Sequence, residues 1–383
     1  MTRVAICGVA RTPIGKFRGS LSNLSAVDLG IRAVKELLHR CNIDPETGII
    51  DELLFGQVLQ AGAGQAPARQ VALGAGLPNT IAATTINKVC GSSLKAVMMA
   101  ANSIRAGQTQ VVIAGGMESM TNAPKFEKRN GDEKEMVSTM VHDGLWDVYN
   151  DLHMGNTGEI IANECNISRE KMDSFAARSQ HLAAQAEQSG WFDWERFEMP
   201  ELNCDEGIRA NTTEEKLAEL APVFQEGGTV TAGNASTLND GASAVLLTSV
   251  DFARENGWEI IAIVEDYCTS GVEPSRVMYA PIPAIKTLLQ RANLDVLDVE
   301  IYEHNEAFAS ASCAVAQEQE LGIPHDRFNL HGGAVSLGHP LGSSGTRCLI
   351  TMLGVMRRLD AKSGIVSLCL GGGNAVAMRV SID

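Results

Sequence analysis

Residues 33–44, AVKELLHRCNID, recur further along the chain as residues 284–295, AIKTLLQRANLD. A second match keeps the same offset, because Gly-Ser-Ser at 91–93 recurs at 342–344. Chance matches at two distant places would not share one register, so the pattern indicates a duplicated unit. We therefore expect two related halves whose matched edges meet at a junction.

The composition is that of a globular protein with a large core: 383 residues, 45% hydrophobic and 20% charged. The formal net charge of −15 argues against nucleic acid as a partner, since a phosphate backbone would be repelled. A small anionic ligand is still compatible with this charge, provided that a few cations gather locally.

The nine cysteines are scattered, form no Cys-x-x-Cys pair and show no metal-ligand spacing. No secretory segment precedes the first strand-like run, and no run of about 18 apolar residues could span a bilayer. We therefore expect free thiols, no bound metal, no membrane contact and a cytoplasmic location.

Strands and helices alternate in each half, which implies layered α/β architecture. The first half is predicted to contain strands at 4–9, 53–58 and 111–116, and helices at 24–39 (N-cap Ser25) and 94–104. The second half is predicted to contain strands at 260–264, 299–302 and 364–370, and helices at 282–292, 307–320 and 345–358.

A segment of different character, with charged stretches and few strand-like runs, separates the halves. Helical spacing dominates it at 168–188, with Ser168 as N-cap. It is too long, and in places too apolar, for a disordered linker, so we interpret it as an insertion over the junction. The predicted division is an N-terminal half at 1–116 plus 241–259, an insertion at 117–240 and a C-terminal half at 260–383.

Cys90 stands at the start of a predicted helix, where unpaired N–H groups and the helix dipole favour the nucleophilic thiolate. A small buried hydrophobe beside a helix would leave the same sequence. His339, between Gly338 and Pro340 in a glycine-rich stretch, is a candidate base for such a thiol, which it must reach by hydrogen bond. The alternative for His339 is a turn histidine without a role.

Cys369 lies at the end of the last predicted strand and precedes three glycines at 371–373. A thiol with a pKa between neutrality and about 8.5 could exchange a proton with the carbon next to a thioester. The glycines leave backbone N–H groups free to face an oxyanion, although a core cysteine before a glycine turn fits as well. Asn305 directly follows another strand, where its amide could cap a helix or hold a water molecule.

Together these motifs resemble the thiolase family, and within it the biosynthetic acetyl-CoA C-acetyltransferases. The motifs are Cys90, Asn305-Glu306-Ala307-Phe308, Gly338-His339-Pro340 and Cys369-x-Gly371-Gly372-Gly373, and the likeness runs from Val4 to Met378. The resemblance implies a thiolase-like fold, with two duplicated αβαβα-type layered halves and an inserted, mainly helical loop domain.

By this resemblance, Cys90 would carry the acyl group, His339 would activate it, and Cys369 would be the acid/base that forms the carbanion. Asn305 would hold a water that, with His339, stabilises the enolate. The N–H groups of Cys90 and Gly371 would form the second oxyanion site, and donors in such sites are each worth about 3–4 kcal/mol.

The family's loop domain binds coenzyme A as part of the substrate, and the resemblance implies no tightly bound cofactor. Matching positions for coenzyme A are Leu145, His153, Met154, Arg209, Phe224, Ala232 and Ser236, with Met278 and Phe308 at the acyl and pantetheine end. Arg209 would supply a cation for the nucleotide part.

The implied reaction is a ping-pong Claisen condensation of two acetyl-CoA to acetoacetyl-CoA plus CoA, and the reverse thiolysis, through acetyl-Cys90. The alternatives are a degradative thiolase for longer 3-ketoacyl-CoA and a non-catalytic CoA-binding scaffold. His304 and a shortened stretch at 278–281 depart from the family pattern and leave the chain-length preference open. The resemblance also implies a homo-oligomer, a dimer of dimers joined through a loop like residues 125–146.

Overall fold

The computed structural model describes residues 2–130, 133–317 and 319–382. The strands of the first half are β1 (Val4–Arg11), β2 (Gly15–Lys16), β3 (Glu52–Gly56), β4 (Ala82–Ile86), β5 (Val111–Ser119) and β10 (Asn239–Ser249). Those of the second half are β11 (Ala262–Gly271), β12 (Ile301–His304), β13 (Ser363–Leu370) and β14 (Asn374–Ser381). The main helices of the two halves are α1 (Ala26–Arg40), α2 (Pro67–Gly74), α3 (Ser92–Arg105), α7 (Val250–Glu255), α8 (Pro281–Ala292), α9 (Ala309–Ala316), α10 (Ala334–Leu337) and α11 (Ser344–Leu359).

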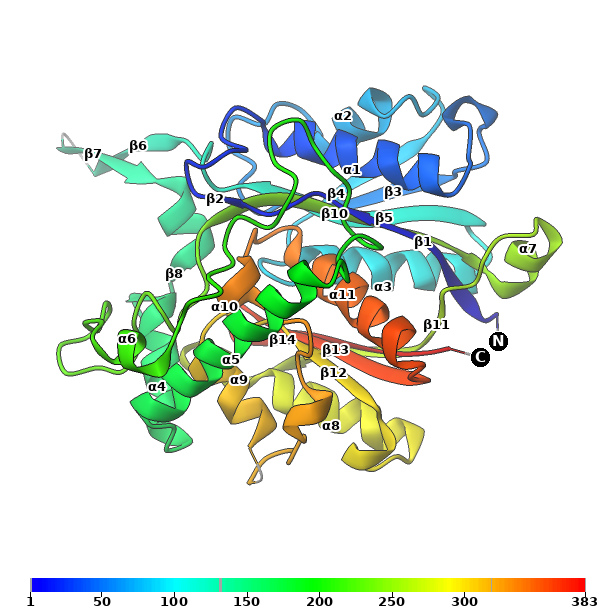
Figure 1. Ribbon diagram of the computed structural model, residues 1–383. Coiled ribbons are helices and arrows are strands. Elements are labelled where there is room, and N and C mark those ends of the chain that lie inside the picture. The colour runs from blue at the N-terminus through cyan, green and yellow to red at the C-terminus, as the bar shows by residue number, and fades with distance from the viewer. Residues whose placement is uncertain (1, 131–132, 318, 383) are drawn as a thin grey trace.

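These strands form layers with the helices, in the order helix, sheet, helix, sheet, helix (Figure 1). Hydrogen bonds join the strands in the order β12-β13-β14-β11-β1-β10-β5-β3-β4, with β2 beside β10. Helices α1 and α2 cover one outer face and α8 the other, while α3 and α11 pack against each other between the two parts of the sheet. The largest apolar cluster fills this middle layer, so the predicted layered α/β fold is confirmed.

The duplication is visible in the strand order. The first half runs β4-β3-β5-β10-β1 and the second runs β12-β13-β14-β11. Phe328 forms a single parallel bridge with Tyr302 of β12, at the place that β4 occupies beside β3. The inserted segment enters between β5 and β10, whereas β13 leads directly into β14.

The repeated sequence marks the ends of two equivalent helices. Asn42 and Asn293 follow α1 and α8 with φ of 52° and 53°, a left-handed conformation that asparagine tolerates better than most residues. Asp44 and Asp295 then precede short 3₁₀ turns as their N-caps. The shared Asn-x-Asp therefore encodes the same helix stop and the same following turn in both halves.

Most predicted helices are confirmed within a few residues. Ser25 caps α1 in a reciprocal box with Asp28, as expected for a helix starting there. The helix predicted at 307–320 is wrong in extent, because α9 ends at Ala316; residue 318 lies outside the described residues. Helix α9 is buried along nearly its whole length, so no polar face marked its end in the sequence.

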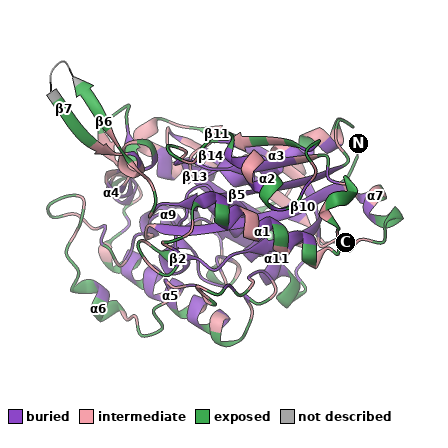
Figure 2. Cartoon of the chain, turned by 90° about the horizontal axis from the view of Figure 1, so that it is seen from above, coloured by how far each residue is buried: buried purple, intermediate pink, exposed green. Residues whose placement is uncertain are grey.

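The inserted segment contains β6 (Lys125–Asn130), β7 (Glu133–Ser138), a π-helical turn (Met140–Leu145), β8 (Trp146–Asp147), β9 (Leu152–His153), α4 (Met154–Glu164), α5 (Arg169–Gln188) and α6 (Glu214–Ala218). Two short antiparallel pairs, β6–β7 and β8–β9, lie where few strands were expected. The β6–β7 hairpin projects from the body of the molecule and is largely exposed (Figure 2). Strands β5 and β10 extend slightly into the interval 117–240 that was assigned to the insertion.

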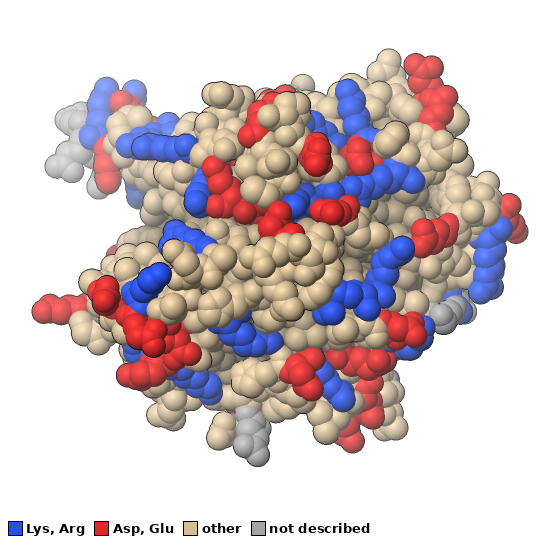
Figure 3. Space-filling view, viewed as in Figure 1, with Lys and Arg blue, Asp and Glu red and all other residues tan. Residues whose placement is uncertain are grey.

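None of the described helices is both long and apolar enough to cross a membrane. Acidic and basic side chains are intermingled on the face seen in Figure 3, which offers no broad basic surface there for nucleic acid.

Candidate active site

Cys90 sits in a strained turn between β4 and α3. Val89 has a φ of 46°, which is unfavourable for a β-branched side chain. The turn is held by Asn87 Oδ1, which accepts from Val89 N at 3.0 Å, and by Ser92 Oγ, which donates to Val89 O at 2.6 Å. Gly91 is the N-cap of α3, so Cys90 lies two residues before the first helical residue, Ser92, on a backbone that these bonds hold in place.

His339 is carried by the loop between α10 and α11. Gly338 has a φ of 108°, and a Cβ there would lie 2.3 Å from the Asn239 side chain, so only glycine fits. Asn239 Oδ1 in turn accepts from His339 N at 3.0 Å. A strand of the first half thereby fixes the histidine of the second half.

The imidazole of His339 has a defined tautomer. Its Nδ1 lies 2.6 Å from Ser344 Oγ, which itself donates to Pro340 O at 2.8 Å. Since the hydroxyl has one proton, Nδ1 must donate to it, and Nε2 is the unprotonated nitrogen. Burial lowers the pKa of His339 to about 3, so the ring is neutral and can accept a proton at Nε2.

Asn305 follows β12 and is fully buried beside His339, with Nδ2 donating to Nε2 at 3.4 Å. Its Oδ1 accepts from the Cys348 thiol at 3.8 Å, which orients the amide. Helix α9 starts only at Ala309, with Phe308 as N-cap, so the helix-capping interpretation of Asn305 is wrong.

Residues from both halves converge on one small cavity of about 50 Å³. Cys90 and Cys369 both line it, together with His339 and Gly371. The N–H groups of Cys90 and Gly371 donate toward the Cys90 sulfur. Cys369 Sγ lies 3.6 Å from Met278 Sδ, which closes one side of the cavity. The two thiols and the imidazole that the sequence singled out thus share a single space.

Both thiols are neutral at rest. Burial raises the pKa of Cys90 to about 12, outweighing the two N–H donors, and burial also raises the pKa of Cys369. The direction of the Cys90 shift is opposite to the one that its place before a helix favours. The helix end favours the anion, but the closed apolar surroundings cost more. Each thiol needs a base within the cavity.

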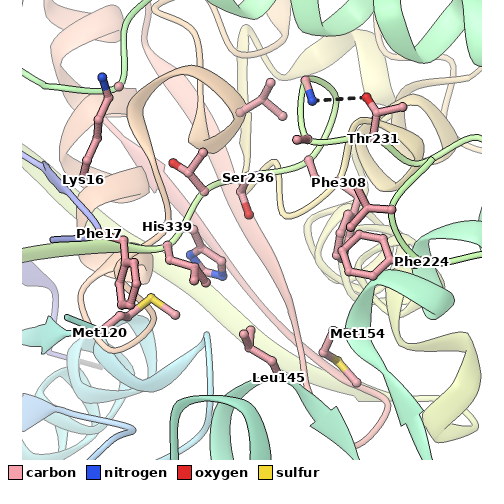
Figure 4. A pocket seen from close by; sticks show the side chains of 18 of the residues that line it. Lys16, Phe17, Met120, Leu145, Met154, Phe224, Thr231, Ser236, Phe308 and His339 are labelled. Atoms are coloured by element: carbon pink, nitrogen blue, oxygen red, sulfur yellow. Dashed lines mark hydrogen bonds between the residues drawn. The ribbon is translucent and has the colours of Figure 1, made fainter. Parts of the chain in front are cut away.

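A larger pocket of about 580 Å³ opens outward from this cavity, a size that suits a ligand of moderate length. The two spaces share the following lining residues: Leu145, Met154, Ser236, Phe308, His339 and Leu341. The predicted coenzyme A positions that line the outer pocket are Leu145, His153, Met154, Arg209, Phe224, Ala232, Ser236 and Phe308. Met278 lines the inner cavity instead. Figure 4 places His339 between Lys16 and Phe17 on one side of the view and Phe224 and Phe308 on the other.

Two protein-family models account for nearly all of the chain. Residues 4–251 match "Thiolase, N-terminal domain" and residues 258–382 match "Thiolase, C-terminal domain". The chain belongs to the thiolase family. An acetyl-CoA acetyltransferase of Cupriavidus necator is 46% identical, with 99% of each chain covered. A probable acetyl-CoA acyltransferase of Staphylococcus aureus is 43% identical, over 100% of this chain and 99% of the relative.

A solved structure has the same fold throughout. It is the Acat5 thiolase from Ascaris suum in complex with coenzyme A, with a TM-score of 0.94, 38% identity and 99% of both chains covered. The predictions of the family, of the thiolase-like fold and of an enzyme are therefore confirmed.

One wall of this thiolase's outer pocket is aromatic. The His153 ring stacks on Phe224 at 4.9 Å, and Phe224 meets Phe308 edge-on at 6.1 Å. His153 Nδ1 also accepts from Gly155 N at 3.0 Å as the N-cap of α4, which fixes the ring. The wall is thus held in place before any ligand arrives.

Several residues that support the thiolase site were missed from the sequence. Ser344 and Asn239 hold His339, as described above. Glu118 is fully buried and accepts from the backbone N–H groups of Val58, Leu59 and Gly342 at 3.0, 3.2 and 2.9 Å. The partners of Glu118 lie far away in the chain, so no local pattern announced its role.

His304 and the cysteines were also singled out in the sequence. His304 lines neither cavity, and its Nδ1 lies 3.1 Å from Ser367 Oγ in the interior. All nine cysteines are free. In the described part of the chain, no group of three or more His, Cys, Asp or Glu side chains is placed to hold a metal ion.

Proposed function

We propose that this thiolase condenses two molecules of acetyl-CoA to acetoacetyl-CoA and CoA, and catalyses the reverse thiolysis, through an acetyl group on Cys90. The observation that carries the proposal is the shared cavity of Cys90, Cys369 and a neutral His339 whose Nε2 is unprotonated. The acetyltransferase name of the Cupriavidus necator relative supports the same substrate.

In the first half-reaction, His339 Nε2 takes the Cys90 proton while the sulfur attacks the thioester carbonyl. The N–H groups of Cys90 and Gly371, which already face the sulfur, are placed to stabilise the tetrahedral oxyanion. The carbon–sulfur bond to CoA then breaks, and the departing thiolate takes the proton back from His339.

In the second half-reaction, His339 Nε2 takes the Cys369 proton, and the resulting Cys369 thiolate takes a proton from the methyl carbon of a second acetyl-CoA. His339 and Asn305, which touch at 3.4 Å, lie where they can stabilise the enolate oxygen. The enolate carbon attacks the acetyl carbonyl and the bond to Cys90 sulfur breaks. His339 then gives its proton to the Cys90 thiolate while Cys369 keeps the methyl proton, so both thiols and the neutral imidazole are restored.

The inner cavity favours the acetyl substrate over longer chains. Its volume is about 50 Å³, and Met278 packs against Cys369 at its edge. A degradative enzyme for long 3-ketoacyl-CoA would need room beyond this wall. Relative rates on acetoacetyl-CoA and on a longer 3-ketoacyl-CoA separate the two reactions.

Covalent labelling tests the proposal. After incubation with acetyl-CoA, mass spectrometry should find one acetyl group on the Cys90 peptide, and acetyl-CoA should shield Cys90 from iodoacetamide. Cys90→Ala should remove both the label and turnover, while Cys313→Ala, a buried thiol outside the cavity, should keep them. Coenzyme A binding without acetylation would instead favour the non-catalytic scaffold.

Three further features are part of the proposal. They are coenzyme A held along the outer pocket as substrate without a tightly bound cofactor, a cytoplasmic location, and a homotetramer paired through the region at 125–146. Residues 131 and 132 of that region lie outside the described residues. Light scattering on the intact protein and on a variant lacking the β6–β7 hairpin tests the tetramer.

A further inference from the structure

We propose that Lys16 is an additional substrate-binding residue, which together with Arg209 supplies the positive charge that binds the phosphate groups of coenzyme A. This inference rests on the proposed function, because a CoA thioester is what would bring phosphates to the outer pocket. Lys16 belongs to none of the motifs that identified the family.

The backbone holds Lys16 at the pocket wall although its side chain is exposed. Strand β2 pairs with β10, so that Lys16 stands opposite Asn239, whose side chain binds the His339 backbone. Lys16 N donates to Glu206 Oε2 at 2.8 Å, and Phe17 N donates to Leu238 O at 3.0 Å. The backbone of Lys16 is therefore fixed to the frame that carries the catalytic imidazole.

Among the described residues that line the outer pocket, one is a lysine, Lys16, and one is an arginine, Arg209. Within the described part of the chain, neither side chain has an ion pair or a hydrogen bond to its charged end. The carboxylate of Glu206 accepts from Lys16 N and from Ser20, whose Oγ donates at 2.9 Å, and it also interacts electrostatically with the Lys16 ammonium. Two cations without a close ion pair on one pocket of a protein with a formal charge of −15 favour an anionic ligand there.

The position along the pocket matches the chemistry of the substrate. Lys16 and Arg209 line the outer pocket and not the inner cavity, whereas Cys90 and Cys369 line the inner cavity. A CoA thioester carries its reactive carbonyl at one end and its phosphates beyond the pantetheine arm. With the carbonyl at the thiols, the phosphates lie toward the outer pocket, which Lys16 lines. In Figure 4, Lys16 lies on the other side of His339 from Phe224 and Phe308.

Calorimetric titration of the intact protein tests the assignment, with coenzyme A, dephospho-coenzyme A and reduced pantetheine as probes. Lys16→Met should weaken coenzyme A binding about three- to fivefold, the size expected for one exposed ion pair. The ratio of coenzyme A affinity to pantetheine affinity should fall by the same factor, and the loss should shrink at high salt. Lys16→Arg should restore the ratio. An equal loss with dephospho-coenzyme A assigns the diphosphate, and no loss with it assigns the 3′-phosphate.

Lys35→Met is the matched control, since it removes an exposed lysine from α1, away from the pocket. The assignment is overturned if Lys16→Met leaves the affinity ratio unchanged, or if Lys35→Met lowers it equally. The outcome is separate from that for the proposed function. Coenzyme A binding that depends on Lys16 without any acetylation of Cys90 defeats the proposed reaction alone, and turnover with an unchanged affinity ratio in Lys16→Met defeats this inference alone.

Discussion

Ser344 Oγ accepts a hydrogen bond from His339 Nδ1 at 2.6 Å and donates one to Pro340 O at 2.8 Å. This relationship decides which imidazole nitrogen can act as a base. Ser344 is also the first residue of α11 and belongs to the Gly-Ser-Ser that repeats the one at α3. The start of this helix therefore also fixes the tautomer of His339.

Ser344→Ala should lower kcat about 10- to 100-fold with little change in KM. Without the acceptor, the proton is free to move to Nε2, and the fraction of His339 able to take the Cys90 proton falls. Steady-state thiolysis of acetoacetyl-CoA measures the change. Ser343→Ala removes a neighbouring hydroxyl that bonds to Ser243 instead, and should keep kcat within about twofold of wild type. Equal losses in the two variants would mean that loop packing, and not the tautomer, is responsible.

Alkylation of Cys90 by iodoacetamide should keep accelerating with pH from 7 to beyond 9. Because burial raises the pKa of this thiol to about 12, the thiolate is a small fraction throughout that range and grows about tenfold per pH unit. Rates are best followed by mass spectrometry of the Cys90 peptide in the absence of substrate. A rate that levels off near neutrality would reveal a low-pKa thiolate and contradict the neutral resting state.

Local pattern predicted the scaffold of the site well. Apolar spacing located α1, α3 and α11, and the glycine-rich stretch around His339 is one in which Gly338, with a φ of 108°, is required. The duplication could be found because Asn42 and Asn293 must each end a helix in the left-handed region. Helix spacing and positions with a positive φ can be predicted from residues close together in the sequence.

Long-range requirements were not visible in the same way. Glu118 acts on a loop more than half the chain away, and Lys16 reaches the pocket only because β2 pairs with β10. The protonation state of Cys90 also escaped prediction, since it depends on how completely other segments cover the sulfur. The position before a helix lowers the pKa of Cys90, but burial by the rest of the structure raises it by more.

Glu118→Gln should lower the free energy of unfolding by about 1–3 kcal/mol, because the amide nitrogen cannot accept one of the three backbone N–H groups that Glu118 now binds. Urea denaturation measures the loss. Glu259→Gln, in an exposed pair with Arg357, should change stability by less than about 0.5 kcal/mol. Stability losses of the same size in both variants would show that the buried bonds at Glu118 contribute little.

Met278→Ala should shift the substrate preference toward longer chains. The side chain borders the inner cavity and lies 3.6 Å from Cys369 Sγ, so its removal opens space beside the acyl group. We expect the ratio of kcat/KM for a six-carbon 3-ketoacyl-CoA over acetoacetyl-CoA to rise at least about 10-fold, as one or two methylene groups gain room. Truncating a buried methionine also costs about 2–5 kcal/mol of stability, so a control with the same cost is needed. Met352→Ala provides it, because Met352 is buried in the middle layer and lines neither cavity. An unchanged ratio in Met278→Ala, or an equal rise in Met352→Ala, would remove Met278 as the wall that limits chain length.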